Sequence, residues 1–411
     1  MALLVLKFGG TSVGDVERIK NAAAKVAAEV QRGHKVAVVV SAMAGVTDQL
    51  IGYCNAMAPH HNSREHDVVV ATGEQVTAGL MAIALQQRGL NARSWQGWQV
   101  PLCTDSTHSK ARILKIEADE FRKRAEEGEI GVMAGFQGRT ADGSISTLGR
   151  GGSDTSAVAL AIALKAQRCD IYTDVDGVYT TDPRIVTKAR KLPRVSYEEM
   201  LEMAALGAKV LQTRSVEMAM RFRMPIQVLS TFANAVGSEL PGTLVTDGDD
   251  TMEQSSVTGI AYTRDEAKIT LVKVADKPGI AASVFVPLAK AGINVDMIVQ
   301  TAAHDDKATD ITFTVAKNDL DRARMVLEGE HKNIGYTKLD AAADVTKISL
   351  VGAGMRSHPG VAATMFETLA DKKINIQVIE TSEINTSVLI AEEYTELALR
   401  ALHTAYGLDT K

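Results

Sequence analysis

The first half of the chain alternates short apolar runs with longer stretches of helical periodicity. Residues 2–6 and 35–40 are almost continuously apolar, which is typical of strands buried on both faces of a sheet. Residues 15–32 between them have helical spacing and stop at Gly33. The alternation continues to about residue 245 and predicts an α/β domain with a largely parallel central sheet. Further strands are expected at 130–134, 170–173 and 226–230, and further helices at 74–87, 153–165 and 197–220.

The second half contains an internal repeat. Residues 269–276 read ITLVKVAD and are followed by KPG, a helical stretch and INVDMIVQ. Residues 348–353 read ISLVGA and are followed by HPG, a helical stretch and INIQVIE. Each copy continues with another apolar strand and a second helix, so the unit is β-α-β-β-α-β, a ferredoxin-like pattern.

The two copies end differently, and this difference predicts how they are joined. The first copy closes with a fourth strand near 334–339, whereas the second runs out at Lys411 after its second helix. The apolar run 257–262 is the candidate to cover the edge left open. We therefore predict that the first repeat is inserted into the second. The predicted divisions are a first domain at 1–245, a polar linker at 246–256, a first repeat at 264–342, and a second repeat at 257–263 plus 343–411.

Composition narrows the class of protein. Its 45 basic and 50 acidic side chains show no long run of one sign, so neither a nucleic-acid partner nor an anionic membrane is indicated. The three cysteines, Cys54, Cys103 and Cys169, form no CxxC pair, so neither a zinc site nor a disulfide framework is expected. The N-terminus does not resemble a signal peptide, and no segment approaches the roughly 20 apolar residues that span a bilayer. We expect a cytoplasmic protein.

A glycine-rich sequence, KFGGTSVGD, follows the first predicted strand. Gly9 and Gly10 allow the backbone to approach an anion closely, with amide N–H groups free to point at it. The next helix presents its N-terminus, and Lys7 adds a positive charge. The segment is a candidate phosphate site, although a plain turn is an equally good reading. It is neither a Walker loop nor a GxGxxG fingerprint.

A second glycine-rich loop, GRGGSDTSA, leads into another predicted helix. Its only cation, Arg150, would bind a carboxylate with two hydrogen bonds, and Asp154 would pair with an ammonium group. Glu74, in the sequence ATGEQ, is a further acidic partner. Together these residues suggest a receptor for a free amino acid. The alternative is that Ser153 or Asp154 caps the helix and that Glu74 favours the start of its own helix.

Two other clusters are less specific. In YTDVDGVYTTDPR, Asp174 and Asp176 are close enough in sequence to bind a nucleotide or its Mg²⁺. Arg184 could bind phosphate oxygens. The alternative is that the segment is an ordinary turn. The cluster does not match a calcium loop, because Ile185 stands where a glutamate is needed. His60, His61 and His66 match no standard metal motif and are expected in an exposed polar loop.

Five motifs together resemble the aspartate kinases of the amino-acid kinase superfamily. They are KFGGTS at Lys7, SAMAGVTD at Ser41, TGEQ at Thr72, GRGGSDT at Gly149 and YTDVDGVYTTDPR at Tyr172. The repeats, with DKPG and SHPG each followed by a helix and an IN-containing strand, look like the paired ACT domains of the same enzymes. The resemblance covers essentially the whole chain. It implies ATP-dependent phosphorylation of the aspartate β-carboxylate, the first step of the lysine, threonine and methionine pathway.

The resemblance also implies residue roles, with ATP and Mg²⁺ as cofactors. Lys7 and Asp154 would be catalytic. The residues implied for ATP binding are Lys7, Phe8, Gly9, Gly10, Ser12, Ser41, Thr173, Asp174, Tyr179, Arg184 and Lys209. Those implied for aspartate binding are Thr47, Glu74, Arg150, Gly151, Gly152, Ser153 and Asp154.

For the repeats, the resemblance implies feedback inhibition by lysine, threonine or both, often in a cup completed by a partner chain. A homo-oligomer is therefore expected, and an internal start at Met252 would give a separate regulatory polypeptide. The implied effector residues are Asp276, Ala281, Asn294, Val295, Asp296, Gln300, Val361, Ala362, Asn375, Ile376, Ser382 and Glu383. Two rival functions stay open: a kinase for another acid, such as glutamate or N-acetylglutamate, and a non-catalytic amino-acid sensor that retains the kinase fold.

Overall fold

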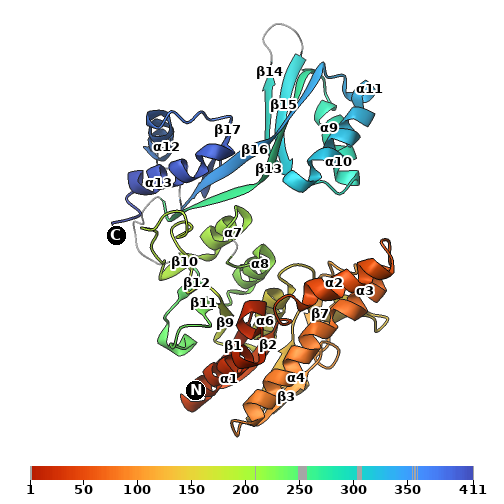
Figure 1. Ribbon diagram of the computed structural model, residues 1–411, viewed down its shortest axis with the longest axis vertical. Coiled ribbons are helices and arrows are strands. Elements are labelled where there is room, and N and C mark those ends of the chain that lie inside the picture. Colours follow the sequence, from red (N-terminus) through yellow and green to blue (C-terminus); the bar gives the residue numbers. More distant parts are fainter. Residues whose placement is uncertain are drawn as a thin grey trace. The chain divides into compact units, whose positions relative to one another are not determined.

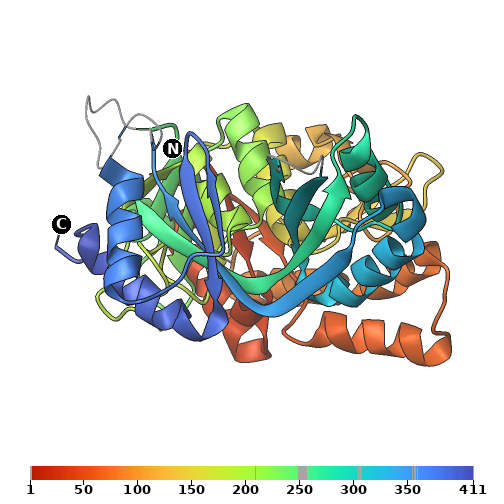
Figure 2. The ribbon, with the colours of Figure 1, turned by 90° about the horizontal axis from the view of Figure 1, so that it is seen from above.

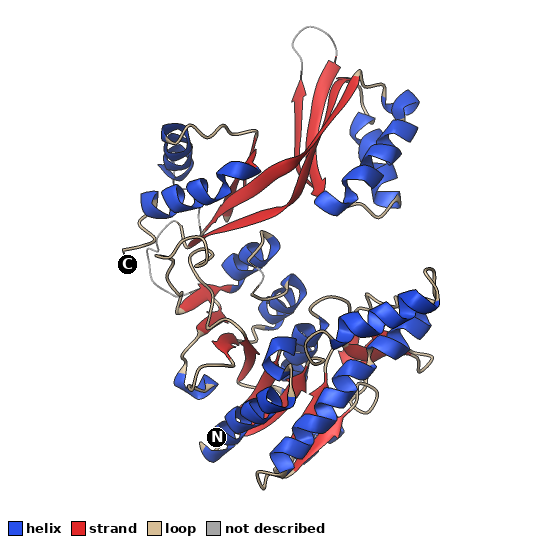
Figure 3. Cartoon of the chain, viewed as in Figure 1, coloured by secondary structure: helices blue, strands red, loops and turns tan. Residues whose placement is uncertain are grey.

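The computed structural model describes residues 2–208, 210–248, 257–302, 308–353, 355, 358 and 360–410. It divides into two compact units (Figures 1 and 3). The first unit comprises residues up to 178 together with 191–204 and the described part of 209–250. The second comprises 179–190, 205–208 and the described residues after 250.

The first unit is built on an eight-stranded sheet in the order β10-β12-β11-β9-β1-β2-β6-β3. All neighbours in it are parallel except β11 and β12. The central strands are buried on both faces, as their apolar sequences predict, and the five strands expected from the sequence are all confirmed. Their bounds are β1 Leu3–Phe8, β2 Lys35–Val40, β3 Ala92–Trp95, β6 Ile130–Ala134, β9 Arg168–Thr173, β10 Arg194–Ser196, β11 Ile226–Ser230 and β12 Thr243–Thr246.

Helices pack on both sides of this sheet (Figure 3). The Asp15 side chain caps α1 by accepting a hydrogen bond from the Arg18 amide. α6 is buried on nearly every side, and its sequence is accordingly apolar without a polar face. The bounds are α1 Val16–Gln31, α2 Val46–Met57, α3 Ser63–Val70, α4 Thr72–Gln86, α5 Asp119–Glu126, α6 Gly152–Leu164, α7 Tyr197–Ala205 and α8 Thr213–Phe222.

The single helix expected at 197–220 is wrong. The structure has two helices, α7 and α8, with an interruption at 206–212. Gly207 lies in this interruption with φ of +117°, and a Cβ there would lie 2.1 Å from the Tyr262 carbonyl oxygen. A helix cannot continue through that backbone conformation, so the chain turns at Gly207.

One helical stretch differs from the expectation that no segment approaches the length and apolar character of a membrane span. Residues Ser63–Gln86, which α3 and α4 form almost without a break, are long and apolar enough to cross a membrane by length and composition. Half of the apolar window is nevertheless buried inside the protein, and the stretch contains the acidic side chain of Glu74. A helix in the core of a globular protein can have the same length and composition.

A smaller sheet in the order β5-β4-β7-β8 lies within the first unit. It is anchored by the carboxylate of Asp67 on α3, which is fully buried. Asp67 accepts hydrogen bonds from the His108 ring, from Ser109 and from the amide and hydroxyl of Thr147, at 2.7–3.3 Å. The strands are β4 Leu102–Thr104, β5 Ile113–Ile116, β7 Gln137–Arg139 and β8 Ile145–Thr147. One carboxylate therefore fixes the chain just before the loop that begins at Gly149.

The second unit contains a six-stranded sheet in the order β14-β15-β13-β16-β18-β17. Two long strands, β13 and β16, form its centre and run through both repeats (Figure 2). Gly259 to Thr263 of β13 pair with Val351 to Lys347, and Lys268 to Val272 pair with Ala342 to Lys338. Each repeat thus has the ferredoxin-like fold, which confirms the expected fold class. The exact domain boundaries stay a prediction.

Two apolar cores lie under this sheet, one for each repeat. The strand expected at 334–339 is wrong at its start, because Ile334 ends the short helix α11 and Gly335, at φ of +76°, turns the chain before β16 begins at Lys338. The remaining bounds are β13 Gly259–Ala275, β14 Val295–Ala302, β15 Ala308–Ala316, β16 Lys338–Val351, β17 Val378–Thr381, β18 Asn385–Ala391, α9 Ile280–Lys290, α10 Leu320–Gly329, α11 His331–Ile334, α12 Gly360–Asp371 and α13 Thr395–Ala405.

Residues 179–190 belong to the second unit although they follow β9 closely in sequence. Val186 is part of the apolar core of the second repeat. The Thr180 hydroxyl lies 2.9 Å from Nε2 of His403, and the Arg190 guanidinium donates to the Leu408 carbonyl at 2.8 Å. The Tyr262 hydroxyl donates to the Asp182 carboxylate at 3.1 Å. This segment, which we call the 179–190 segment, is thus fixed by both apolar and polar contacts.

We expect Asp67→Asn to lower the free energy of unfolding by about 2–3 kcal/mol, because an amide nitrogen would replace an acceptor that faces buried donors. Urea denaturation followed by circular dichroism measures this change. Glu65→Gln is the matched control on the same helix, because Glu65 is exposed and its ion pair with Arg64 contributes little. Equal effects of the two substitutions would contradict the anchoring role.

Candidate active site

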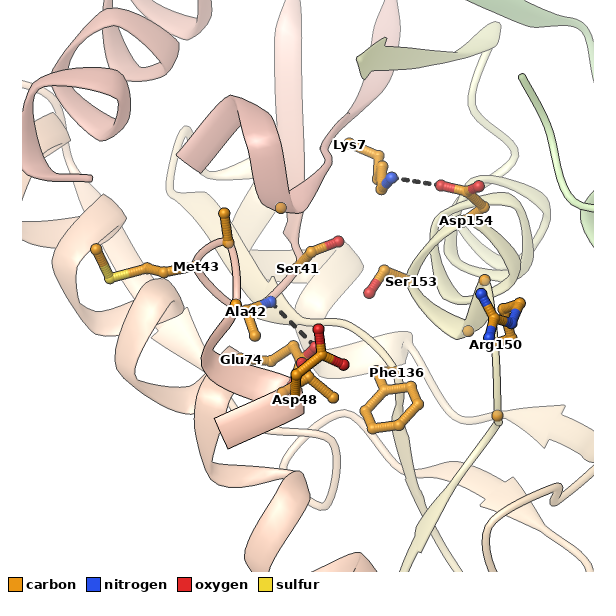
Figure 4. Close-up of a pocket in the computed structure, with 17 residues that line it drawn as sticks. Lys7, Ser41, Ala42, Met43, Asp48, Glu74, Phe136, Arg150, Ser153 and Asp154 are labelled. Carbon is orange, nitrogen blue, oxygen red and sulfur yellow. Dashed lines mark hydrogen bonds and ion pairs between the residues drawn. The ribbon is translucent and has the colours of Figure 1, made fainter. Parts of the chain in front are cut away.

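A cleft of about 330 Å³ lies in the first unit at the carboxyl ends of β1 and β2 (Figure 4). Parallel sheets bind ligands at this edge, where strand-to-helix turns bring backbone amides and polar side chains together. Turns at the ends of β1, β2 and β6 and at the start of α6 contribute here. The lining residues are Lys7, Gly10, Ser41, Ala42, Met43, Ala44, Gly45, Thr47, Asp48, Glu74, Phe136, Gly149, Arg150, Gly151, Gly152, Ser153 and Asp154.

A buried ion pair lies at the centre of this cleft. Nζ of Lys7 on β1 is 2.5 Å from Oδ1 of Asp154 in the first turn of α6 (Figure 4). Both residues are more than nine-tenths buried. Burial makes each charge costly by itself, so each one compensates for the other. A ligand that carries both charges could exchange partners with this pair.

The glycine-rich turn before α6 has a conformation that only glycine tolerates well. Gly151 has φ of +69°, and a Cβ there would lie 1.8 Å from Cγ of Gln212. The Arg214 guanidinium braces the preceding chain by donating to the carbonyls of Leu148, at 2.7 Å, and Ala111, at 3.0 Å. The exposed Arg150 side chain is thus carried by a rigid turn at the edge of the cleft.

Glu74, in the first turn of α4, brings a second carboxylate to the cleft. Its Oε1 accepts a hydrogen bond from the Ala42 amide at 3.0 Å, and its Oε2 is buried without a hydrogen-bond partner among the described residues. Burial raises the pKa of Glu74 to about 7, and the bond from Ala42 offsets only part of this rise. An unsatisfied acceptor of this kind is suited to a cationic ligand.

The turn after β1 differs from the expectation in one respect. The Gly9 amide is not free, because it donates to the Tyr172 carbonyl at 3.1 Å. Ser12 is fully buried and donates to the same carbonyl at 3.2 Å, and Phe8 stacks on the Tyr172 ring. Of this motif, Lys7 and Gly10 line the cleft. The ATP-binding roles of Phe8, Gly9 and Ser12 stay predictions.

The other residues assigned to ATP are not in the described cleft lining, except Ser41. Thr173 and Asp174 lie at the carboxyl end of β9, beside the end of β1, with the Thr173 hydroxyl 3.1 Å from Oδ1 of Asp174. Tyr179 and Arg184 lie in the 179–190 segment of the second unit, and Arg184 pairs with Asp182 at 2.8 Å. Lys209 lies outside the described residues.

Asp48 and Phe136 are among the lining residues to which the sequence analysis assigned no role. Asp48 lies on α2 one residue after Thr47 and faces the same cleft (Figure 4). Phe136 has φ of +67°, and its amide donates to the Ser156 hydroxyl at 3.1 Å. Asp48 belongs to the SAMAGVTD motif, so the motif could have indicated it. Nothing in the sequence marks the unusual backbone of Phe136.

In the second unit, the residues implied for effector binding have different surroundings. Val361 is part of an apolar core, and the Ser382 hydroxyl accepts from the amides of Ile384 and Asn385. Asp296 forms an ion pair with the buried Lys347 at 2.6 Å, which links the two repeats. Their roles stay predictions, as do those of the others: Asp276, Ala281, Asn294, Val295, Gln300, Ala362, Asn375, Ile376 and Glu383.

Comparisons with known proteins agree with this architecture. Residues 2–230 match the model of the amino acid kinase family, and residues 268–331 and 348–406 each match an ACT domain. The chain is 54% identical to an aspartokinase of Pseudomonas aeruginosa, over 100% of this chain and 98% of the relative. It is 46% identical to aspartokinase 2 of Bacillus subtilis, over 99% of this chain and 98% of the relative.

A solved structure supports the same conclusion. Aspartokinase III of E. coli in complex with aspartate and ADP superposes with a TM-score of 0.81 at 26% identity, covering 98% of this chain and 99% of that one. Taken with the cleft and the paired repeats, these similarities show that the chain belongs to the aspartate kinase family, with an amino acid kinase domain and two ACT domains.

Proposed function

We propose that the cleft transfers the γ-phosphoryl group of ATP to the β-carboxylate of L-aspartate and yields 4-phospho-L-aspartate. The observation that carries this proposal is the convergence of one guanidinium, two buried carboxylates and one buried ammonium on a single cleft. The E. coli relative has been solved with aspartate and ADP, which supports the same assignment. The reaction is the proposed first step of the lysine, threonine and methionine pathway.

The amino-acid head group needs complementary charges, and the cleft supplies them. Arg150 would hold the α-carboxylate through its planar fork of donors, with Gly151, Gly152 and Ser153 beside it. Glu74 and Asp154 would accept the α-ammonium group, with Thr47 at the same wall. An N-acylated acid lacks this ammonium group and would leave a buried carboxylate unpaired.

The chemistry itself needs no general base, because the attacking β-carboxylate is already ionised near neutral pH. Catalysis then rests on alignment and on cationic stabilisation of the transferring phosphoryl group. Lys7 would supply this stabilisation once the substrate ammonium group pairs with Asp154 in its place. The ion pair thus holds Lys7 in the ligand-free protein and releases it on binding.

Mg²⁺ fits the residues at the end of β9. Asp174 and Thr173 offer the hard oxygen donors that this cation prefers, and Asp174 is exposed. They would hold the ion beside the nucleotide phosphates, where it would neutralise phosphate charge. The ATP roles of Tyr179, Arg184 and Lys209 belong to the same proposal.

The ACT domains are proposed to regulate this reaction by binding lysine, threonine or both. The E. coli relative has also been solved with lysine and aspartate, at a TM-score of 0.75 and 26% identity. We further propose a homo-oligomer joined through ACT domains and a cytoplasmic location, with which three free cysteines are consistent.

Lys7→Ala should lower kcat for aspartate phosphorylation by at least about 100-fold while changing the KM for aspartate far less, because the lost charge acts mainly on the transition state. A coupled assay of ADP release measures both constants. Lys20→Ala is the control, because Lys20 is exposed and paired with Glu17. An unchanged kcat would refute the role. Thermal unfolding checks that the variant stays folded with Asp154 unpaired.

The raised pKa of Glu74 predicts a pH dependence. As the pH falls below about 7, Glu74 becomes neutral, so kcat/KM for aspartate should fall by up to about tenfold per pH unit. In Glu74→Gln this dependence should vanish while affinity drops at every pH. The same shift should destabilise the ligand-free protein as pH rises from 4.5 to about 7, since the folded state retains a proton that the unfolded chain has released. A pH profile that Glu74→Gln leaves unaltered would contradict this assignment.

Lysine and threonine should each be tested by calorimetric titration, alone and together, with inhibition measured in parallel. We expect binding by at least one of them and a higher KM for aspartate or a lower kcat in its presence. Asp296→Asn should weaken binding if this residue contacts the effector. Glycine and glutamate are control ligands. Absence of both binding and inhibition would overturn the regulatory assignment.

A further inference from the structure

We propose that Cys54, His61 and His66 form a binding site for a divalent transition-metal cation of the zinc class. The three residues lie where α2 and α3 join, and the candidate ligand atoms are all within 4.8 Å of one another. None of them lines the cleft described above. The chemistry of the proposed site is one thiolate and two imidazoles, the ligands that Zn²⁺ and its neighbours in the first transition row prefer.

The local fold explains why these residues meet although their spacing matches no standard motif. Cys54 lies in the last turn of α2, which ends after Met57, and Ala58 closes the helix by donating to the Cys54 carbonyl at 3.1 Å. Asn62 then caps α3 by accepting from the Arg64 amide at 2.8 Å. The reversal between these caps carries His61, and the first turn of α3 brings His66 beside it.

The hydrogen bonds fix the tautomer of His61. Its Nδ1 lies 2.8 Å from the Ala58 carbonyl oxygen. Because a carbonyl only accepts, Nδ1 must carry the proton, and the lone pair of the neutral ring is on Nε2. Histidines that bind metals are oriented by this same arrangement, in which the other ring nitrogen donates to a backbone carbonyl.

The exposed lone pair of His61 faces a second imidazole. Nε2 of His61 lies 2.8 Å from Nδ1 of His66, and the two rings lie nearly edge to edge, inclined by 15° with centroids 5.0 Å apart. Two lone pairs at this distance would repel, so either a proton on His66 or a cation must lie between them. Without metal, His66 donates. With metal, its proton moves to Nε2 and both nitrogens become ligands.

The adjustment that metal binding needs is small. Zn–N bonds of about 2.0–2.1 Å in a tetrahedral site place two nitrogens about 3.3 Å apart, so the two nitrogens must separate by about 0.5 Å and each ring must turn until its lone pair points at the cation. Cys54 is 9% exposed and both histidines are partly buried, so the site is shielded but reachable. Binding would release the thiol proton of Cys54 to solvent, and a water molecule would fill the fourth position.

The exposed-loop interpretation of PHHNSREHD suits His60 but not its neighbours. His60 is exposed and absent from the cluster, whereas His61 and His66 are partly buried and aimed at each other. Because helical folding brings Cys54 to them, a count of sequence spacings could not reveal the third ligand. The segment therefore contains its own control residue one position away from a proposed ligand.

Titration of the chelator-treated, tag-free, full-length protein with Co²⁺ tests the proposal. We expect one equivalent to bind with a thiolate-to-cobalt charge-transfer band, and one equivalent of Zn²⁺ to displace it. Cys54→Ser should abolish the band, and His61→Ala or His66→Ala should weaken Zn²⁺ binding at least about tenfold, since each removes a direct ligand. His60→Ala and Cys103→Ser should leave both readouts unchanged.

Two results would overturn the proposal: a band that survives in Cys54→Ser, or wild-type Zn²⁺ binding no tighter than that of a Cys54→Ser/His61→Ala double variant. Circular dichroism and the aspartate kinase activity of each variant, assayed with Mg²⁺ but without Zn²⁺ or Co²⁺, show whether it is folded. A variant that fails these checks is replaced by His61→Gln or Cys54→Ala, which remove the same ligand atoms with less change in volume or polarity.

Discussion

The first unit is organised around the buried contact between Lys7 and Asp154. Lys7 is the last residue but one of β1, a strand near the middle of the sheet, and Asp154 lies in the first turn of α6, which is buried on nearly every side. Two charges that are expensive to bury separately become tolerable together, so the end of β1 and the start of α6 must lie side by side. That requirement aligns the two glycine-rich turns on one cleft. In the proposed reaction, an incoming ammonium group would pair with Asp154 and a phosphate group with Lys7.

Much of this arrangement could be predicted from the chain. Continuous apolar runs predict the buried parallel strands, and the two motifs that contain Arg150, Asp154 and Glu74 predict that these three side chains form one site. Long-range contacts could not be predicted in this way. The Gly9 amide is occupied by Tyr172, more than 160 positions away. The unsatisfied oxygen and raised pKa of Glu74 arise from burial, which is a property of the fold. Similarly, the break at Gly207 depends on the backbone of Tyr262.

The two ACT domains are joined through common strands as well as being similar in fold. Since β13 and β16 each cross both repeats, neither sheet can shift its register without affecting the other. Side chains reinforce this linkage. Lys347 is buried and lies 2.6 Å from Asp296 of the first repeat and 3.5 Å from Glu380 of the second. Next to it, Met297, Val345, Val378 and Leu389 form a small apolar cluster that also draws on both repeats. A ligand that altered one repeat would therefore act on a structure common to the two.

The 179–190 segment has a consequence for any shorter product of the same gene. A polypeptide that began at Met252 would contain both repeats but would lack this segment. It would therefore lose Val186 from the apolar core of the second repeat, and it would lose Thr180 and Arg190, which are the partners of His403 and Leu408. Such a fragment would expose an apolar surface beside unsatisfied polar groups. It would therefore have either a lower stability than the same repeats within the full chain or a vacant site to which a complementary peptide could bind. A free regulatory subunit and a regulatory domain of identical sequence would thus differ in their surfaces.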